Sequence, residues 1–180
     1  FTGSTATGRM VAERAAKRLI GYSLELGGKN PMIVLPGADP GQAAELALAA
    51  AFGNSGQLCV SIERVYAPQA LVPHLLDELQ RRVSALKLGT SDDFEHDLGP
   101  LTSQAQLARV QSKIADGVAA GARVVAGGAA EPTLGLNYYL PTVVAVESAD
   151  NPLLRDEVFG PVIAVVGYEN LDEAVRQAND

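Results

Sequence analysis

One sulfur atom offers the strongest chemistry in this sequence. Cys59 is the only cysteine in 180 residues and closely follows the loop Gly53-Asn54-Ser55-Gly56. A thiolate is a good nucleophile, but a free thiol has a pKa of about 8.5 and needs activation at neutral pH. The small residues before Cys59 could hold its sulfur at the edge of a cleft, with backbone N–H groups facing a reacting oxygen. The alternative is a small, buried apolar side chain.

Glu25 is the candidate general base. It lies in the segment Leu24-Glu25-Leu26-Gly27-Gly28, a strand end beside two glycines. Partial desolvation in a cleft would raise the pKa of this carboxyl and make it a competent base. The glycines would let a ligand approach the backbone closely. The alternative is an edge-strand glutamate that points into solvent.

Two further segments could hold a nucleotide. Gly3-Ser4-Thr5-Ala6-Thr7-Gly8 combines small and hydroxyl residues at a predicted helix start, where backbone N–H groups favour a phosphate. Plain helix capping would explain the same pattern. If Glu157-Val158-Phe159 is extended, Glu157 and Phe159 face the same side. Glu157 could then offer a carboxylate to a ribose diol, and Phe159 a ring to a flat heterocycle. The alternative is a surface glutamate beside a core phenylalanine.

Alternating helices and short apolar strands must position these residues. The pattern predicts an α/β fold with a largely parallel open sheet flanked by helices. Helices are expected near residues 4–19, 40–52, 68–86, 107–118 and from 171 onward. Strands are expected near residues 22–26, 32–35, 64–66, 124–125, 142–146 and 162–166.

Composition excludes several classes of function. The net charge of −7 and the absence of a basic run argue against nucleic acid or an anionic membrane surface as partner. No apolar run approaches the roughly 18 residues of a membrane helix. One cysteine and two distant histidines leave no disulfide framework, and we expect no metal site. A free thiol and no recognisable export signal favour the cytoplasm.

Taken together, the motifs resemble those of the aldehyde dehydrogenase superfamily. The segments that carry the resemblance are 1–5, Leu24-Glu25-Leu26-Gly27-Gly28-Lys29-Asn30-Pro31, Gly56-Gln57-Leu58-Cys59 and Glu157-Val158-Phe159-Gly160-Pro161, with lesser matches at 98–101 and 139–142. The resemblance implies that Cys59 attacks an aldehyde, that hydride passes to NAD or NADP, and that Glu25 activates the water that hydrolyses the resulting thioester. The cofactor contacts that the resemblance implies are Gly3, Ser4, Thr7, Leu26, Gly27, Glu157 and Phe159.

The resemblance also sets expectations for the whole protein. Residues 1–25 would end a Rossmann-like cofactor domain, and residues 26–180 would form most of a catalytic domain whose C-terminal part is missing. The 180 residues alone are then expected to be inactive, and the full-length enzyme to form a dimer or tetramer. Residues 56–66 are similar to a bacterial succinate-semialdehyde dehydrogenase branch, but Gly53 stands where better-known members place a carboxylate-binding arginine.

Three alternatives stay open, one of which is a cysteine hydrolase that would need no cofactor. A coenzyme A-acylating dehydrogenase typically lacks the base that Glu25 would supply. A non-catalytic protein that keeps the fold would need neither Cys59 nor Glu25.

Overall fold

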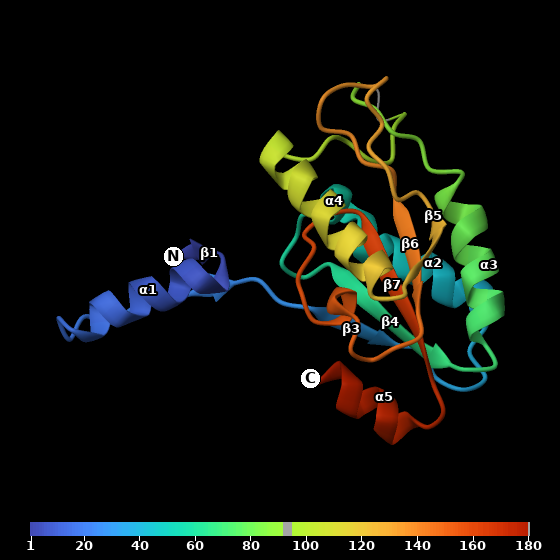
Figure 1. The fold of residues 1–180 in the computed structure, drawn as a ribbon, viewed down its shortest axis with the longest axis horizontal. Coiled ribbons are helices and arrows are strands. Elements are labelled where there is room, and N and C mark those ends of the chain that lie inside the picture. Colours follow the sequence, from blue (N-terminus) through green and yellow to red (C-terminus); the bar gives the residue numbers. More distant parts are fainter. Residues whose placement is uncertain (92–94, 180) are drawn as a thin grey trace.

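A five-stranded sheet forms the centre of the molecule (Figure 1). This computed structural model describes residues 1–91 and 95–179. The strands are β1 (Thr2–Gly3), β2 (Glu25–Leu26), β3 (Asn30–Ile33), β4 (Ile62–Pro68), β5 (Arg123–Ala126), β6 (Thr142–Val146) and β7 (Val162–Tyr168). The helices are α1 (Thr5–Ala16), α2 (Pro40–Phe52), α3 (Val72–Val83), α4 (Gln104–Ala119) and α5 (Leu171–Ala178), with the short 3-10 helices η1 (Gly53–Gly56) and η2 (Pro152–Leu154).

The sheet has the strand order β3-β4-β7-β6-β5, and only the edge strand β5 runs antiparallel to its neighbour. The prediction of a largely parallel α/β sheet is therefore confirmed. β4 and β7 are the longest strands, and Val65 lies opposite Val165 in their register. Because helices cover both faces, side chains from both sides of these strands are buried.

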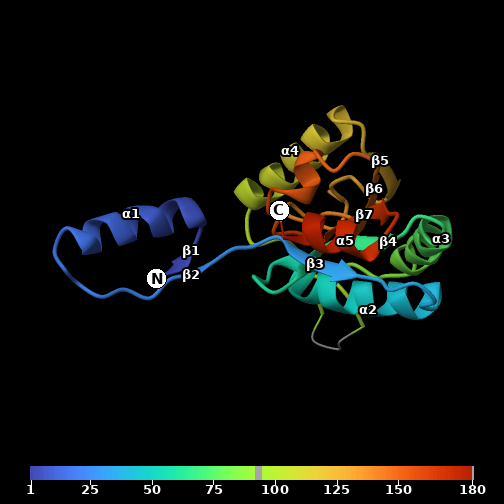
Figure 2. The ribbon, with the colours of Figure 1, turned by 90° about the horizontal axis from the view of Figure 1, so that it is seen from below.

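Helices pack on each face of the sheet (Figure 2). One hydrophobic cluster joins α2 and α3 to the sheet, with Leu75 and Leu79 of α3 fully buried. The other cluster places Val110 and Ile114 of α4, and Ala174 of α5, against the opposite face. The result is a helix–sheet–helix sandwich whose loops carry the candidate site residues.

Most predicted elements are present, with shifted ends. α2 begins as expected, because Asp39 caps it by accepting a hydrogen bond from the Gln42 backbone N–H at 2.8 Å. β4 is longer than the predicted 64–66 and runs on to Pro68, so α3 begins only at Val72.

The N-terminal residues form an arm that extends from the sandwich (Figures 1 and 2). It contains α1 and a two-stranded parallel sheet, in which Thr2 pairs with Glu25. The predicted helix to residue 19 is too long, since Leu19 has a φ of 54° and α1 ends at Ala16. The strand predicted over 22–26 shrinks to Glu25–Leu26, because β1 offers only two residues for pairing.

No helix among residues 1–91 and 95–179 is long and apolar enough to cross a membrane.

Candidate active site

The loop before Cys59 has an unusual backbone. Asn54, Ser55 and Gly56 have positive φ angles of 51°, 55° and 71°. The Ser55 hydroxyl donates to the Gly99 carbonyl at 2.8 Å, and the Gln57 side-chain oxygen accepts from the Thr102 N–H at 2.9 Å. Such backbone strain persists only where the surroundings hold it. The segment 99–102 therefore braces the cysteine loop.

Cys59 is a free, exposed cysteine in the turn that follows this loop. The turn closes through a hydrogen bond from the Ser61 N–H to the Leu58 carbonyl at 3.0 Å. The Asn30 side-chain amide donates to the carbonyls of Cys59 and Ser61 at 2.7 Å and 2.9 Å. The sulfur is thus accessible while its backbone is fixed, and the alternative of a buried packing residue does not apply.

At Gly56 the cysteine loop lies directly against the main chain of the segment before β7. A Cβ placed on Gly56 would lie 2.1 Å from the Gly160 carbonyl oxygen and 2.9 Å from the Pro161 nitrogen. Only glycine allows this approach, and only glycine adopts the φ of 71° without strain. Two segments about a hundred residues apart are thereby brought into contact.

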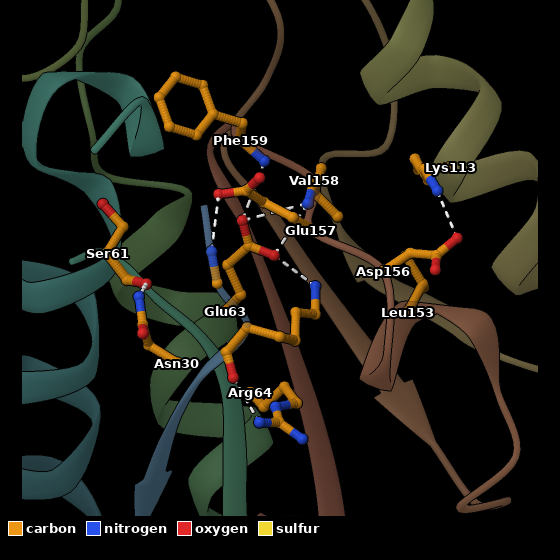
Figure 3. A network of polar contacts seen from close by, with 12 residues as sticks. Asn30, Ser61, Glu63, Arg64, Lys113, Leu153, Asp156, Glu157, Val158 and Phe159 are labelled. Carbon is orange, nitrogen blue, oxygen red and sulfur yellow. Dashed lines mark hydrogen bonds and ion pairs between the residues drawn. The ribbon is translucent and has the colours of Figure 1, made fainter. Parts of the chain in front are cut away.

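Buried side chains hold the main chain of Val158 and Phe159 through both its N–H groups and its carbonyls, and Figure 3 shows the contacts that Glu63 makes. The Glu63 carboxylate accepts from the Val158 N–H at 2.9 Å and from the Phe159 N–H at 2.9 Å. The Gln106 amide nitrogen donates to the Val158 and Phe159 carbonyls at 3.2 Å and 2.8 Å. Phe159 has a φ of 54°, so the extended segment predicted over Glu157-Val158-Phe159 is wrong, and simple alternation does not set its side chains.

The Glu157 carboxylate contacts Gly27 and Gly28, the two glycines of the Glu25 segment. Its Oε1 accepts from the Gly28 N–H at 3.3 Å, and a Cβ on Gly27 would lie 2.1 Å from its Oε2. Burial raises the pKa of Glu157 above its ordinary value of 4.5, the Gly28 N–H opposes this shift, and the charge of Glu63 adds to it. The structure therefore joins Gly27 and Glu157, two of the predicted cofactor contacts.

Lys29 and Glu63 form a buried ion pair beside this contact. Their side chains are only 8% and 5% exposed. Burial lowers the pKa of Lys29, and the Glu63 carboxylate opposes that shift. A buried charge is costly unless it is paired, so each partner needs the other.

These segments surround a cleft of about 300 Å³. Its lining residues are Thr5, Gly27, Gly28, Lys29, Lys113, Arg155, Asp156 and Glu157. A half-buried carboxylate beside a backbone without side chains fits the ribose of a dinucleotide, whose hydroxyls need acceptors and close approach. Cys59 and Glu25 lie outside this lining.

The remaining predicted residues lie on the arm. Glu25 is exposed in β2, so within the described ranges its carboxylate is not desolvated as a cleft base would be. Ser4 caps α1, accepting from the Thr7 N–H at 3.3 Å and donating to the Thr7 hydroxyl at 3.0 Å. Gly3 pairs with Leu26 in the register of β1 and β2. Across residues 1–91 and 95–179, no three His, Cys, Asp or Glu side chains form a group that could hold a metal ion.

Sequence reasoning missed Glu63 and Gln106. A signal for each was present: Glu63 lies in a strand buried on both faces, and Gln106 shares the inward face of α4 with Val110 and Ile114. A polar side chain at such a position must have internal partners, because burying it without them is costly.

Comparison with known proteins adds independent information. The model of the "Aldehyde dehydrogenase family" matches residues 1–180. A Mycobacterium tuberculosis protein with the provisional name succinate-semialdehyde dehydrogenase (NADP+) 2 is 46% identical over 180 residues, which cover 100% of this chain and 35% of that protein. The crystal structure of Mycobacterium tuberculosis aldehyde dehydrogenase complexed with NAD+ matches with a TM-score of 0.95 at 37% identity, covering 100% of this chain and 38% of that chain. The NAD+ complex of aldehyde dehydrogenase from Bacillus cereus matches with a TM-score of 0.93 at 35% identity, covering 100% and 36%. The chain therefore spans about a third of the length of these relatives.

Proposed function

Because this chain belongs to the aldehyde dehydrogenase family, we propose that it carries the nucleophile and general base of an NAD(P)+-dependent aldehyde dehydrogenase. The observation that carries the proposal is the exposed Cys59, braced by Asn30 and held through Gly56 against the segment of Glu157. A reactive sulfur and a ribose-binding carboxylate are then parts of one rigid frame.

Cys59 begins the reaction in this proposal. Its thiolate sulfur bonds to the aldehyde carbon, and the carbonyl electron pair moves to oxygen to give a thiohemiacetal. The backbone N–H of Cys59 stabilises that oxyanion, a contribution typically worth about 2.7–4 kcal/mol for one donor. A thiolate suits the step because it adds readily and later leaves readily.

The cofactor NAD(P)+, when bound, supplies the acceptor for the hydride that the thiohemiacetal carbon must lose. Glu157 would hold its ribose in the cleft beside Gly27, and Phe159 would pack close by. The cofactors named for the relatives support this assignment, since they include both NAD+ and NADP+.

Glu25 completes the reaction. It takes a proton from water, the water oxygen bonds to the thioester carbon, and the carbon–sulfur bond breaks. Cys59 regains its thiolate and a carboxylic acid leaves. Because Glu25 is exposed here, the proposal requires that its desolvation come from bound substrate or from parts of the protein outside these residues.

Succinate semialdehyde is the proposed substrate. Support comes from the 46% identical mycobacterial relative. Gly53 is exposed, and a side chain added there would meet only Leu58 Cδ1 at 3.6 Å, so this position supplies no cation for the substrate carboxylate. We therefore propose that the carboxylate partner comes from elsewhere in the full-length enzyme. Comparison of succinate semialdehyde with butyraldehyde would test this: equal kcat/KM values would contradict it.

We further propose that the 180 residues alone do not turn over and that the full-length enzyme is a cytoplasmic dimer or tetramer. The chain covers about a third of its relatives, and under the proposal the adenosine site lies in the rest. Dehydrogenase activity from the purified 180-residue chain would contradict this.

The decisive test compares Cys59→Ala and Glu25→Gln in the full-length protein. Cys59→Ala should abolish NAD(P)H production with every aldehyde. Glu25→Gln should leave a first burst of NAD(P)H of about one equivalent per site and slow the following turnover, because only thioester hydrolysis needs the base. Glu131→Gln is the control, since Glu131 interacts locally with Thr133. Full activity of Cys59→Ala would refute the assignment.

A further inference from the structure

We propose that Glu63 is a positioning residue that fixes Glu157 and Phe159 for cofactor binding, while its ion pair with Lys29 ties the Cys59 segment to the Glu25 segment. The inference rests on the proposed function, because it assigns a role within that same site. Under this proposal Glu63 contacts neither substrate nor cofactor and acts through the segment 157–159.

The place of the ion pair in the chain supports this role. Lys29 follows Glu25 by four residues, and Glu63 follows Cys59 by four residues. The contact from Lys29 Nζ to Glu63 Oε2 therefore joins the segments that carry the proposed base and nucleophile. Asn30 adds a second link, because its amide donates to the Cys59 carbonyl at 2.7 Å.

The other carboxylate oxygen of Glu63 binds the segment 157–159, so three segments are joined. Glu63 Oε1 lies 3.1 Å from the Val158 nitrogen and 2.9 Å from the Phe159 nitrogen (Figure 3). The negative charge faces two N–H groups in a row, an arrangement that binds a carboxylate strongly. It also holds Phe159 at a φ of 54°, where a bulky residue is strained.

Gln106 holds the same two residues from the opposite side. Its amide nitrogen donates to both carbonyls, so Glu63 and Gln106 together bind both N–H and both C=O groups of Val158 and Phe159. We call this pair the clamp. In Figure 3 the Phe159 ring points away from the Glu63 carboxylate, so the clamp fixes the backbone and leaves the ring free to meet a ligand.

Packing alone does not account for these charges. A buried ion pair is commonly no more stabilising than apolar residues of similar volume. The hydrophobic cluster that joins α2 and α3 to the sheet is built mainly from Val, Leu and Ala side chains, whereas Glu63 and Lys29 are buried charges. The need to hold the backbone of segment 157–159 in one conformation explains the buried polar groups, because apolar side chains could not accept hydrogen bonds from its N–H groups.

The test uses the full-length protein with Glu63→Gln and Gln106→Met. Glutamine keeps the shape of Glu63 but loses its charge and one acceptor oxygen. Methionine keeps the length of Gln106 but loses both donated hydrogen bonds, without leaving a buried charge unpaired. The readouts are the Kd for NAD+ and NADP+ by calorimetry and the hydrogen exchange of the peptide spanning 156–161 without cofactor.

Each variant should weaken cofactor binding about tenfold, equivalent to about 1.4 kcal/mol, and speed exchange of the 158 and 159 amides. Glu78→Gln is the matched control, since it makes the same change in an ion pair on the surface of α3 and should alter neither readout. If Glu63→Gln does not fold, the cofactor Kd and the hydrogen exchange of Gln106→Met serve as the test. If the variants bind cofactor with the wild-type Kd at a temperature well below their melting temperatures, the role of Glu63 is merely structural and the inference is overturned.

Failure of the proposed reaction would look different. Wild-type protein that binds NAD(P)+ but oxidises no aldehyde would remove the proposed function. If its cofactor binding still weakened in Glu63→Gln, the positioning role would stand. If the wild-type protein bound neither cofactor, the positioning role would be overturned.

Discussion

Glu157 has surroundings that make it sensitive to acid. Burial raises its pKa above 4.5, and the partly opposing Gly28 N–H donates to it only at 3.3 Å. Ribose hydroxyls donate hydrogen bonds, and the ionised carboxyl accepts them with both oxygens, whereas protonation turns one oxygen into a donor and weakens this binding.

We therefore expect cofactor affinity to fall as the pH drops from neutral through the raised pKa of Glu157. The same shift acts on stability with the opposite sign. The folded state holds its proton at a pH where the unfolded chain has released it, so this contribution to stability is present at low pH and is lost as the pH rises through the folded pKa. Titration calorimetry across this range should show a pH dependence that Glu157→Gln flattens. An identical pH profile in the variant would contradict the expectation.

Gly27→Ala should damage the site without unfolding it. The new Cβ would lie 2.1 Å from Glu157 Oε2, but a carboxylate at the end of a flexible side chain can move away. We expect the free energy of unfolding to change by less than about 1 kcal/mol, and cofactor Kd to rise about tenfold.

Gly28→Ala is the neighbouring comparison. Its Cβ would approach only Asn30 Oδ1, at 3.4 Å, so Glu157 can keep its place and the rise in Kd should be smaller. An equal rise in both variants would show that the position of Glu157 is not the cause.

At the scale of elements, the loop η1 should respond very differently to two alanine substitutions. Gly56→Ala places a Cβ against the Gly160 backbone at a φ of 71°, and backbone cannot swing aside. We expect a loss of about 2–4 kcal/mol in the free energy of unfolding.

Gly53→Ala is the matched control within the same loop. Its φ of −51° is ordinary, and the nearest neighbour of the added Cβ would be Leu58 Cδ1 at 3.6 Å, so the free energy of unfolding should change by no more than about 0.5 kcal/mol. Urea unfolding of both variants measures the difference. Similar losses at the two positions would contradict the assigned backbone contact.

The elements themselves were largely predictable. α2, β6 and the start of α5 follow from local signals such as Asp39 with Pro40 and the run Thr142–Val146. The boundaries of β4 and the direction of β5 were not predictable, because pairing partners far along the chain decide them. The clamp was not predictable for the same reason. Glu63 and Gln106 form it only because the fold brings β4, α4 and the segment 157–159 together.

At the scale of the whole molecule, the arm and the sandwich should differ in local stability. Gly8 is the only buried residue of α1, whereas β4 and β7 are buried almost throughout. A 12-residue helix without tertiary packing is marginal in water.

In the 180-residue chain we therefore expect the amides of α1 to exchange at least about a hundredfold faster than those of β4 and β7. Hydrogen exchange followed by mass spectrometry measures this directly. Equal protection of α1 and the sheet would show that the arm is stabilised by contacts other than those described.

The meeting of Gly56 with the Gly160 carbonyl has a consequence for sequence divergence. No side chain sets the spacing there, so exposed neighbours such as Leu58 and Val60 are free to vary without moving the sulfur. Related proteins can therefore change their substrate preference by substituting these exposed residues while the backbone that holds the sulfur stays the same.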